Sequence, residues 1–155
     1  MHPDKLVADL PTFLQEIFLL KEKNKTVVLT NGCFDLLHEG HHHLLNEAKK
    51  LGDTLIVLVN SDSSVKRLKG NSRPIETLSL RLQKLAAIQA IDYLLPFEED
   101  TPEDKIKLII PHILVKGTDY EGAHVAGSSF AGKVVFIPLL EGYSTTLCIQ
   151  KGNHT

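Results

Sequence analysis

Four histidines lie within six residues in the segment His38-Glu39-Gly40-His41-His42-His43. A neutral imidazole can donate a hydrogen bond to a phosphate oxygen, and a glycine lets the backbone approach a ligand closely. If a helix begins at His41, this residue lies on the same side as the apolar residues of the following turns, which are Leu44, Leu45, Ala48 and Leu51. The N–H groups at such a helix start attract anions. The pattern therefore predicts that His38, Gly40 and His41 bind a phosphorylated ligand.

The other two histidines, His42 and His43, fall in line with polar and charged residues one turn further on, so we expect both to be exposed to solvent. For His38 and His41, the competing interpretation is that they too are surface residues of a polar loop. Zinc is a third possibility for a histidine cluster. However, no cysteine or carboxylate is spaced to complete a tetrahedral site with these imidazoles, and we predict no dedicated metal site.

Helices and strands alternate around the histidine segment. Continuously apolar runs predict buried strands over residues 25–31, 55–59, 92–95, 113–115 and 134–137. Amphipathic stretches predict helices over residues 12–23, 41–51, 78–90 and 102–109, with a last short helix from residue 144. This alternation predicts an α/β fold with a Rossmann-like, doubly wound parallel sheet of about five strands. We assign it to residues 25–155, preceded by an N-terminal helical extension over residues 1–24.

Ligands of doubly wound sheets bind outside the carboxyl ends of the strands. The candidates for nucleotide and phosphate binding that follow the expected strands are Asn31, Gly32, Cys33, Phe34, Lys116, Gly117, Asp119, Ser144, Thr145 and Thr146. Asn60 and Asp62 follow the second strand in the same way. Asp119 can equally be a simple turn residue, and the three hydroxyl residues from Ser144 to Thr146 can equally be ordinary helix caps.

Several cations can meet phosphate near these strand ends. Arg81 lies between Leu85 and Ile88 around the expected helix, where its charge requires either a phosphate or a local carboxylate. Lys69 belongs to a basic segment with Lys66, Arg67 and Arg73, which we expect to be flexible and able to close over phosphates. We expect Lys66 and Arg67 to be solvated, and Lys69 to be either solvated or bound to phosphate.

The composition of the chain limits which classes of function are possible. The chain of 155 residues fits one domain, and its 43% hydrophobic and 23% charged residues are typical of a globular protein. Its net charge of −2 gives no electrostatic case for a nucleic-acid or anionic-membrane partner. No apolar run approaches the roughly 20 residues that span a bilayer. The cysteines Cys33 and Cys148 form no disulfide framework, so we expect a cytoplasmic setting.

The segment from Asn31 to His41 resembles the signature of the cytidylyltransferase-like nucleotidyltransferases, whose hallmark is a His-x-Gly-His loop after the first strand. The longer match resembles the adenylyltransferase domains of bacterial ADP-heptose synthases, which serve lipopolysaccharide core synthesis. It covers roughly residues 25–150, and the matching segments are residues 31–41, 60–70, 73–75, Arg81, 97–102, 115–120 and 144–146.

The resemblance implies transfer of AMP from ATP to a heptose 1-phosphate, with release of pyrophosphate and no protein nucleophile. It implies catalytic roles for His38, His41, Lys69 and Arg81, and contacts to the sugar phosphate from Asn60 and Asp62. Asp35 either orients the histidine loop or contacts the sugar phosphate. Mg²⁺ is expected with ATP, held mostly by phosphates and water, and a homodimer is expected from the family.

Two departures from this resemblance concern the substrate. Thr118 stands where family members have a second glycine in Lys-Gly-Gly-Asp-Tyr, and residues 121–133 form a shorter segment than usual. Only about 24 residues precede the domain, where bifunctional members have a sugar kinase, so we expect a stand-alone transferase. A cytidylyltransferase acting on glycerol 3-phosphate or a similar polyol phosphate and an inactive nucleotide-binding regulator remain alternatives. A dehydrogenase is excluded because no Gly-x-Gly-x-x-Gly follows a strand.

Overall fold

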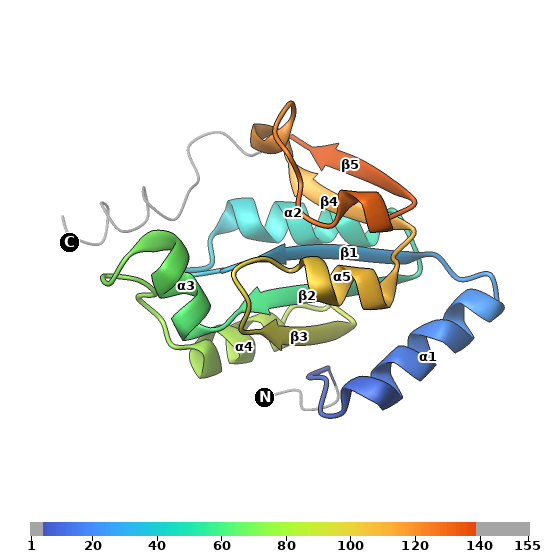
Figure 1. The fold of residues 1–155 in the computed structure, drawn as a ribbon, viewed down its shortest axis with the longest axis horizontal. Coiled ribbons are helices and arrows are strands. Elements are labelled where there is room, and N and C mark those ends of the chain that lie inside the picture. The colour runs from blue at the N-terminus through green and yellow to red at the C-terminus, as the bar shows by residue number, and fades with distance from the viewer. Residues whose placement is uncertain (1–4, 139–155) are drawn as a thin grey trace.

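The computed structural model describes residues 5–138. Its centre is a five-stranded parallel sheet in the order β3-β2-β1-β4-β5 (Figure 1). The strands are β1 (Val27–Gly32), β2 (Thr54–Asn60), β3 (Tyr93–Phe97), β4 (Ile113–Gly117) and β5 (Lys133–Ile137). The predicted doubly wound sheet is confirmed. Its strand order reverses between β1 and β4, which makes the carboxyl ends of these two strands the expected ligand-binding point.

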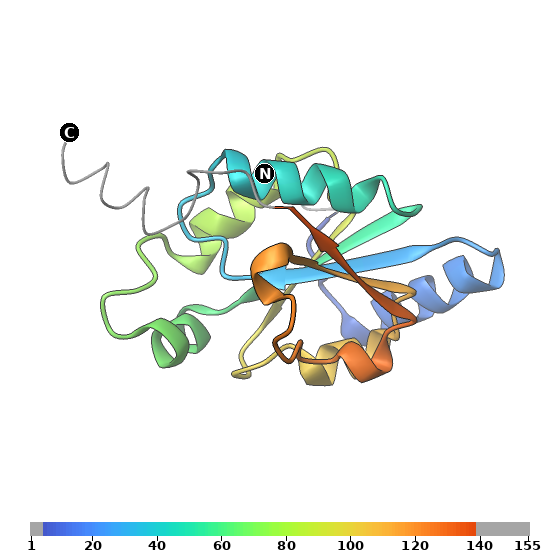
Figure 2. The same ribbon diagram turned by 90° about the horizontal axis from the view of Figure 1, so that it is seen from above.

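The helices cover both faces of this sheet, and they are α1 (Leu10–Glu22), α2 (Glu39–Lys49), α3 (Asp62–Lys69), α4 (Leu78–Ala86) and α5 (Glu103–Ile109). In the view from above, α2 and α4 lie on one side of the strands, and α1 and α5 lie on the other (Figure 2). Two short 3₁₀ turns, η1 (Thr118–Tyr120) and η2 (Ser128–Phe130), separate β4 from β5.

Alternate residues of each strand enter two separate apolar cores, as the period of a strand requires. Val28 of β1 packs with Leu45 of α2 and Leu85 of α4 on one face of the sheet. Its neighbour Val27 packs on the opposite face with Ile17 of α1. Strands that are covered on both faces have no solvent-facing side, so the sequence of β2 from Leu55 to Val59 is apolar at every position.

The N-terminal region belongs to the same packed body. Phe13 and Ile17 of α1 are buried in the second core, and Leu6 forms a parallel bridge with Leu94 of β3. Backbone hydrogen bonds from Val7 N to Leu94 O (2.9 Å) and from Leu94 N to Lys5 O (2.8 Å) extend this pairing. The helix that we assigned to an N-terminal extension therefore covers part of the sheet.

One helix was not predicted. Most of the basic segment lies in the helix α3, which ends at Lys69, and Ser61 caps its start by accepting a hydrogen bond from Ser64 N (3.2 Å). A short polar cap and a single buried valine, Val65, suffice here, and that pattern is too brief to stand out in the sequence.

Other boundaries move by a few residues. Helix α2 begins at Glu39 and not at His41, and α4 ends at Ala86 instead of reaching Ala90. The last helix that we expected from residue 144 lies outside the described residues. Within residues 5–138, no helix is both long and apolar enough to cross a membrane.

Candidate active site

A cavity of about 510 Å³ opens at the carboxyl ends of β1 and β4, where the strand order reverses. Its walls come from the ends of β1, β2 and β4, from the start of α2, from the end of α3, from η1 and from the connection between β3 and α5. The lining residues are Thr30, Asn31, Gly32, Cys33, Phe34, His41, Leu44, Asn60, Leu68, Lys69, Asp100, Pro102, Lys116, Gly117, Asp119 and Tyr120. Ten of the sequence-predicted candidates therefore share one cavity.

The two histidines of the motif hold each other at the start of α2. His38 is the cap residue, and its Nδ1 accepts a hydrogen bond from Gly40 N (3.1 Å). The Nδ1 of His41 accepts a hydrogen bond from His38 N (3.2 Å). The imidazole rings stack with their centroids 3.8 Å apart, and the ring of Phe34 packs edge-on against His41. The Gly40 N–H that we predicted to approach a phosphate is thus bonded to the His38 side chain.

These hydrogen bonds decide where each imidazole carries its proton. An Nδ1 that accepts a hydrogen bond is unprotonated, so the neutral ring carries its proton on Nε2. Burial, and then the neighbouring His38 and His42, lower the pKa of His41 to about 3. Burial and His42 also lower the pKa of His38. At neutral pH, His41 therefore offers a neutral Nε2–H donor beside the cavity.

Lys116, at the end of β4, is a buried cation with weak contacts. Lys116 is 9% exposed, and its Nζ lies 3.4 Å from both the backbone oxygen and the side-chain oxygen of Asn31. The same Nζ stands 4.4 Å from the centre of the Tyr120 ring. Burial lowers the pKa of Lys116 to about 8, although Asp119 acts in the opposite direction. A charge held this loosely is available to a negatively charged ligand.

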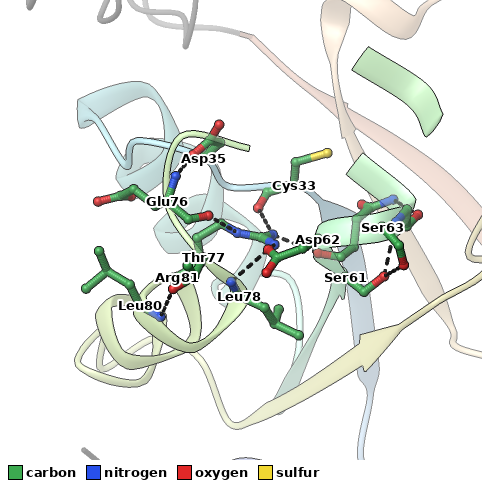
Figure 3. A network of polar contacts seen from close by, with 12 residues as sticks. Cys33, Asp35, Ser61, Asp62, Ser63, Glu76, Thr77, Leu78, Leu80 and Arg81 are labelled. Carbon is green, nitrogen blue, oxygen red and sulfur yellow. Dashed lines mark hydrogen bonds and ion pairs between the residues drawn. The ribbon is translucent and has the colours of Figure 1, made fainter. Parts of the chain in front are cut away.

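Arg81 is fully buried and engaged on several sides (Figure 3). Its Nη1 donates to the carbonyl oxygens of Cys33 and Asn60, both at 2.7 Å. Its Nε donates to Glu76 O (3.0 Å), and its Nη2 forms an ion pair with Asp62 Oδ1 (2.8 Å). The arginine does not line the cavity, but it fixes the backbone at the ends of β1 and β2. The sequence left open whether Arg81 meets a phosphate or a local carboxylate. Among the described residues, its charged partner is the carboxylate of Asp62.

Asp35 fastens the loop after β1 to the connection between α3 and α4. This residue is fully buried, and it accepts hydrogen bonds from Arg73 Nε (2.9 Å), Ile75 N (2.7 Å) and Glu76 N (2.9 Å). Burial acts to raise the pKa of Asp35, but these donors outweigh it and hold the pKa below its usual range. The flanking residues Phe34 and Leu36 have φ angles of +53° and +58°. Such backbone conformations persist only where their surroundings impose them.

Other predicted residues lie around this centre. Asn60 lines the cavity and donates to Ser64 Oγ (3.1 Å), whereas Asp62 accepts from Arg81 and from Leu78 N (2.8 Å). His42 and His43 are half-buried and not fully exposed as expected. Arg67 forms an ion pair with Asp100 (2.6 Å). Ser144, Thr145 and Thr146 lie outside the described residues.

The sequence reasoning did not single out six residues that line the cavity, which are Thr30, Leu44, Leu68, Asp100, Pro102 and Tyr120. Pro102 and Asp100 follow β3, so listing the residues after that strand would have found them. Tyr120 follows Asp119 directly and belongs to the same 3₁₀ turn. Leu68 had no signal, because an exposed leucine on a short helix is an ordinary feature.

The cavity is suited to bind a polyanion with neutral and cationic donors. Lys69 and Lys116 supply positive charge, and His41 supplies a neutral N–H donor. Among residues 5–138, no group of three or more His, Cys, Asp or Glu side chains is arranged to hold a metal ion. Donors fixed in advance around a phosphorylated ligand stabilise charge that develops during phosphoryl or nucleotidyl transfer.

A parallel sheet with a His-x-Gly-His helix start and buried cations at its switch point defines a nucleotidyltransferase of the Rossmann-like α/β class. The family model described as cytidylyltransferase-like matches residues 29–151. The chain belongs to this family, as the histidine motif predicted.

Similar proteins agree with this assignment. The chain is 53% identical over 132 residues to the bifunctional protein HldE of a Nitratiruptor species, and the match covers 85% of this chain and 29% of that protein. It is 46% identical over 155 residues to the HldE of Aliarcobacter butzleri, with 97% and 32% covered. The chain thus spans about three-tenths of the length of these relatives.

Among solved structures, a lipopolysaccharide core biosynthesis protein from Thermoplasma volcanium is similar, with a TM-score of 0.65 and 30% sequence identity. The similarity covers 76% of this chain and 99% of that one.

Proposed function

We propose that this protein is an adenylyltransferase that transfers AMP from ATP to a heptose 1-phosphate, giving an ADP-heptose and pyrophosphate for lipopolysaccharide core or related surface-glycan synthesis. The observation that carries the proposal is the cavity in which His41, Lys69 and Lys116 meet at the switch point of the sheet. The choice of a heptose rests on the longer sequence match to the heptose branch and on the relatives named above.

In the proposed reaction, an oxygen of the sugar phosphate attacks the α-phosphorus of ATP. A bond forms between this oxygen and the α-phosphorus as the bond between the α-phosphorus and the bridging oxygen of the β-phosphate breaks. Pyrophosphate leaves with the electron pair of the broken bond. The Nε2–H groups of His38 and His41 donate hydrogen bonds to the triphosphate and to the leaving group. A neutral donor of this kind stabilises charge without a proton transfer, which is consistent with the low pKa of His41.

The remaining candidates position the substrates. Lys69 and Lys116 attract the phosphates and the rest of the nucleotide, and the backbone from Asn31 to Phe34 approaches the α-phosphate. At Gly32 an added Cβ would lie 3.1 Å from the Phe34 ring, so only glycine fits there without movement. Arg81 acts by holding the Cys33 and Asn60 carbonyls, and Asp35 acts by holding the loop after β1. Asn60, which lines the cavity, is the proposed contact of the sugar phosphate, whereas Asp62 is paired with Arg81 and does not line the cavity.

Mg²⁺ is part of the proposal as a companion of ATP, because a triphosphate requires charge neutralisation. Among residues 5–138, the cavity offers only two carboxylates, Asp100 and Asp119, so phosphate oxygens and water would supply most of the ligands of the ion. When bound, the ion would withdraw charge from the phosphoryl oxygens. We further propose that the enzyme acts in the cytoplasm as a homodimer, and light scattering of the purified protein tests the dimer.

The substrate assignment is tested by measuring pyrophosphate release. The protein is incubated with Mg²⁺ and either ATP or CTP, each with heptose 1-phosphate or glycerol 3-phosphate. Release with ATP and heptose 1-phosphate supports the proposal. Release with CTP and glycerol 3-phosphate alone would replace it with the cytidylyltransferase alternative. Thermal stabilisation by ATP without turnover of any pair would indicate a nucleotide-binding regulator.

A further inference from the structure

Arg73, in the connection between α3 and α4, is a partly buried cation with an unused donor. Its side chain is 13% exposed, and its Nε forms the 2.9 Å ion pair with Asp35 Oδ2. Its Nη2 is buried and has no hydrogen-bond partner within the described part of the chain. Buried donors are nearly always paired in native proteins, so an unpaired guanidinium nitrogen requires an explanation.

The carboxylate of Asp35 does not accept a hydrogen bond from this Nη2. Asp35 Oδ2 also accepts a hydrogen bond from Ile75 N (2.7 Å), and Asp35 Oδ1 accepts one from Glu76 N (2.9 Å). Arginine and carboxylate commonly form two parallel hydrogen bonds, but here the acid accepts from Nε and not from Nη2. Asp35 thus fixes the position of the guanidinium and leaves Nη2 for another acceptor.

Arg73 does not itself line the cavity, but its partner Asp35 directly follows two residues that do, Cys33 and Phe34. Burial raises the pKa of Cys33, whereas the positive charges of Lys69, Arg81 and Arg73 act in the opposite direction. Cys33 itself lines the cavity. Arg81 directs its donors to carbonyl oxygens and to Asp62, whereas Arg73 retains one donor without a partner among residues 5–138. Through Asp35, Arg73 is therefore held next to the loop after β1, which forms part of the cavity wall.

We propose that the Nη2 of Arg73 binds a phosphate oxygen of a substrate, with Asp35 holding the guanidinium in position. Guanidinium groups match phosphate oxygens in both geometry and charge. The inference rests on the proposed function, which supplies two phosphorylated substrates, ATP and a sugar 1-phosphate. Their phosphates share the same chemistry, so the experiment must distinguish them.

The test compares the variant Arg73→Lys with the control Lys84→Gln. A lysine keeps the positive charge next to Asp35 but lacks the second nitrogen. Lys84 of α4 forms an ion pair with Glu76, which lies in the same connection as Arg73, and Lys84 does not line the cavity. Its replacement therefore disturbs this connection but leaves the guanidinium of Arg73 in place. ATP and heptose 1-phosphate are titrated separately by calorimetry, the latter also in the presence of a non-hydrolysable ATP analogue. Urea unfolding of each variant checks the fold.

We expect Arg73→Lys to weaken binding of one ligand by about 10- to 100-fold, the usual value of a hydrogen bond to a charged group. The ligand that is affected identifies the phosphate. Binding of both ligands within a factor of about two of the unchanged protein would overturn the proposal, and so would equal losses in Lys84→Gln. If Arg73→Lys does not fold, the double variant Asp35→Asn/Arg73→Gln, which removes both charges of the pair, is titrated under the same criteria.

These titrations also separate this inference from the proposed function. Unchanged protein that binds ATP but never turns over heptose 1-phosphate contradicts the assigned reaction. The ATP affinity of Arg73→Lys still decides the role of Arg73 in that case, because binding does not require turnover.

Discussion

Arg81 and Lys116 are both buried cations near the carboxyl ends of the strands, but their surroundings differ. Arg81 is 0% exposed and donates to three carbonyl oxygens and one carboxylate at 2.7–3.0 Å. Lys116 is 9% exposed, and its two hydrogen bonds are both 3.4 Å long. Each cation has lost much of its hydration, but only Arg81 has replaced it with short hydrogen bonds.

This difference separates a structural role from a binding role. A cation with short bonds to several acceptors joins the segments that carry them, here the ends of β1 and β2 and the start of α4. A cation with long bonds and a lowered pKa has binding capacity left for a ligand. The comparison makes four predictions, which begin with the largest expected effect.

The variant Arg81→Met is expected to lower the free energy of unfolding by about 3–5 kcal/mol, the usual cost of removing one partner of a buried ion pair. It also leaves the carbonyls of Cys33 and Asn60 without their donor. Urea denaturation measures this loss. The matched control Lys84→Gln lies on the same helix in a half-exposed ion pair and should cost less than about 1 kcal/mol. Equal effects of the two variants would contradict a structural role for Arg81.

The variant His41→Ala is expected to lower kcat by about 10²–10³, the usual effect of removing one donor to a developing charge. Steady-state pyrophosphate release measures this change. His43→Ala is the matched control on the same helix, because His43 does not line the cavity. Its activity should stay within a factor of about three, because the imidazole of His43 lies outside the cavity and has no role in the proposed reaction. A near-normal kcat of His41→Ala would exclude His41 from the proposed reaction.

The variant Lys116→Met is expected to weaken ATP binding about tenfold without a loss of stability. Methionine fills a similar volume and carries no charge to desolvate, so the free energy of unfolding should stay the same or rise. Calorimetry with ATP and urea denaturation measure the two quantities. A clear loss of stability with normal ATP affinity would place Lys116 in the same structural class as Arg81.

The pH dependence of ATP binding gives the smallest effect. Because burial lowers the pKa of Lys116 to about 8, ATP affinity should fall as pH rises from about 7 to about 9 and the lysine loses its charge. Lys116→Met should not show this fall. The stability of the fold changes in the opposite direction. Between about pH 8 and the higher pKa that Lys116 has in the unfolded chain, only the unfolded state keeps this proton. The free energy of unfolding therefore rises with pH over this range.

Much of the fold followed from local patterns in the sequence. The apolar runs that became β1, β2 and β4 have no polar face, and a parallel sheet covered on both sides is the arrangement that suits them. Helix α3 escaped prediction because its fold depends on Ser61 as a cap and on contacts with the segment after β3. Short helices depend on tertiary packing more than on their own propensity.

The candidate site divides in the same way. The periodicity of α2 was enough to place His41 on the inner side of its helix, and the rule that ligands bind at the carboxyl ends of parallel strands was enough to group the residues that follow β1 and β4. The hydrogen bonds of the His38 and His41 rings, which fix the proton on Nε2, could not be predicted. They depend on the helix starting two residues earlier than the periodicity indicated.

The sequence by itself therefore determined the type of sheet, the family and most of the residues that line the cavity at its carboxyl end. Only the tertiary structure decided what each buried charge contacts. Arg81 reaches Cys33, which is 48 positions away, and Arg73 reaches Asp35 across 38 positions. Periodicity specifies which side of an element is buried, because that depends on neighbours a few residues apart. The choice between a carbonyl, a carboxylate and a substrate phosphate depends on groups that only the folded chain brings within hydrogen-bonding distance.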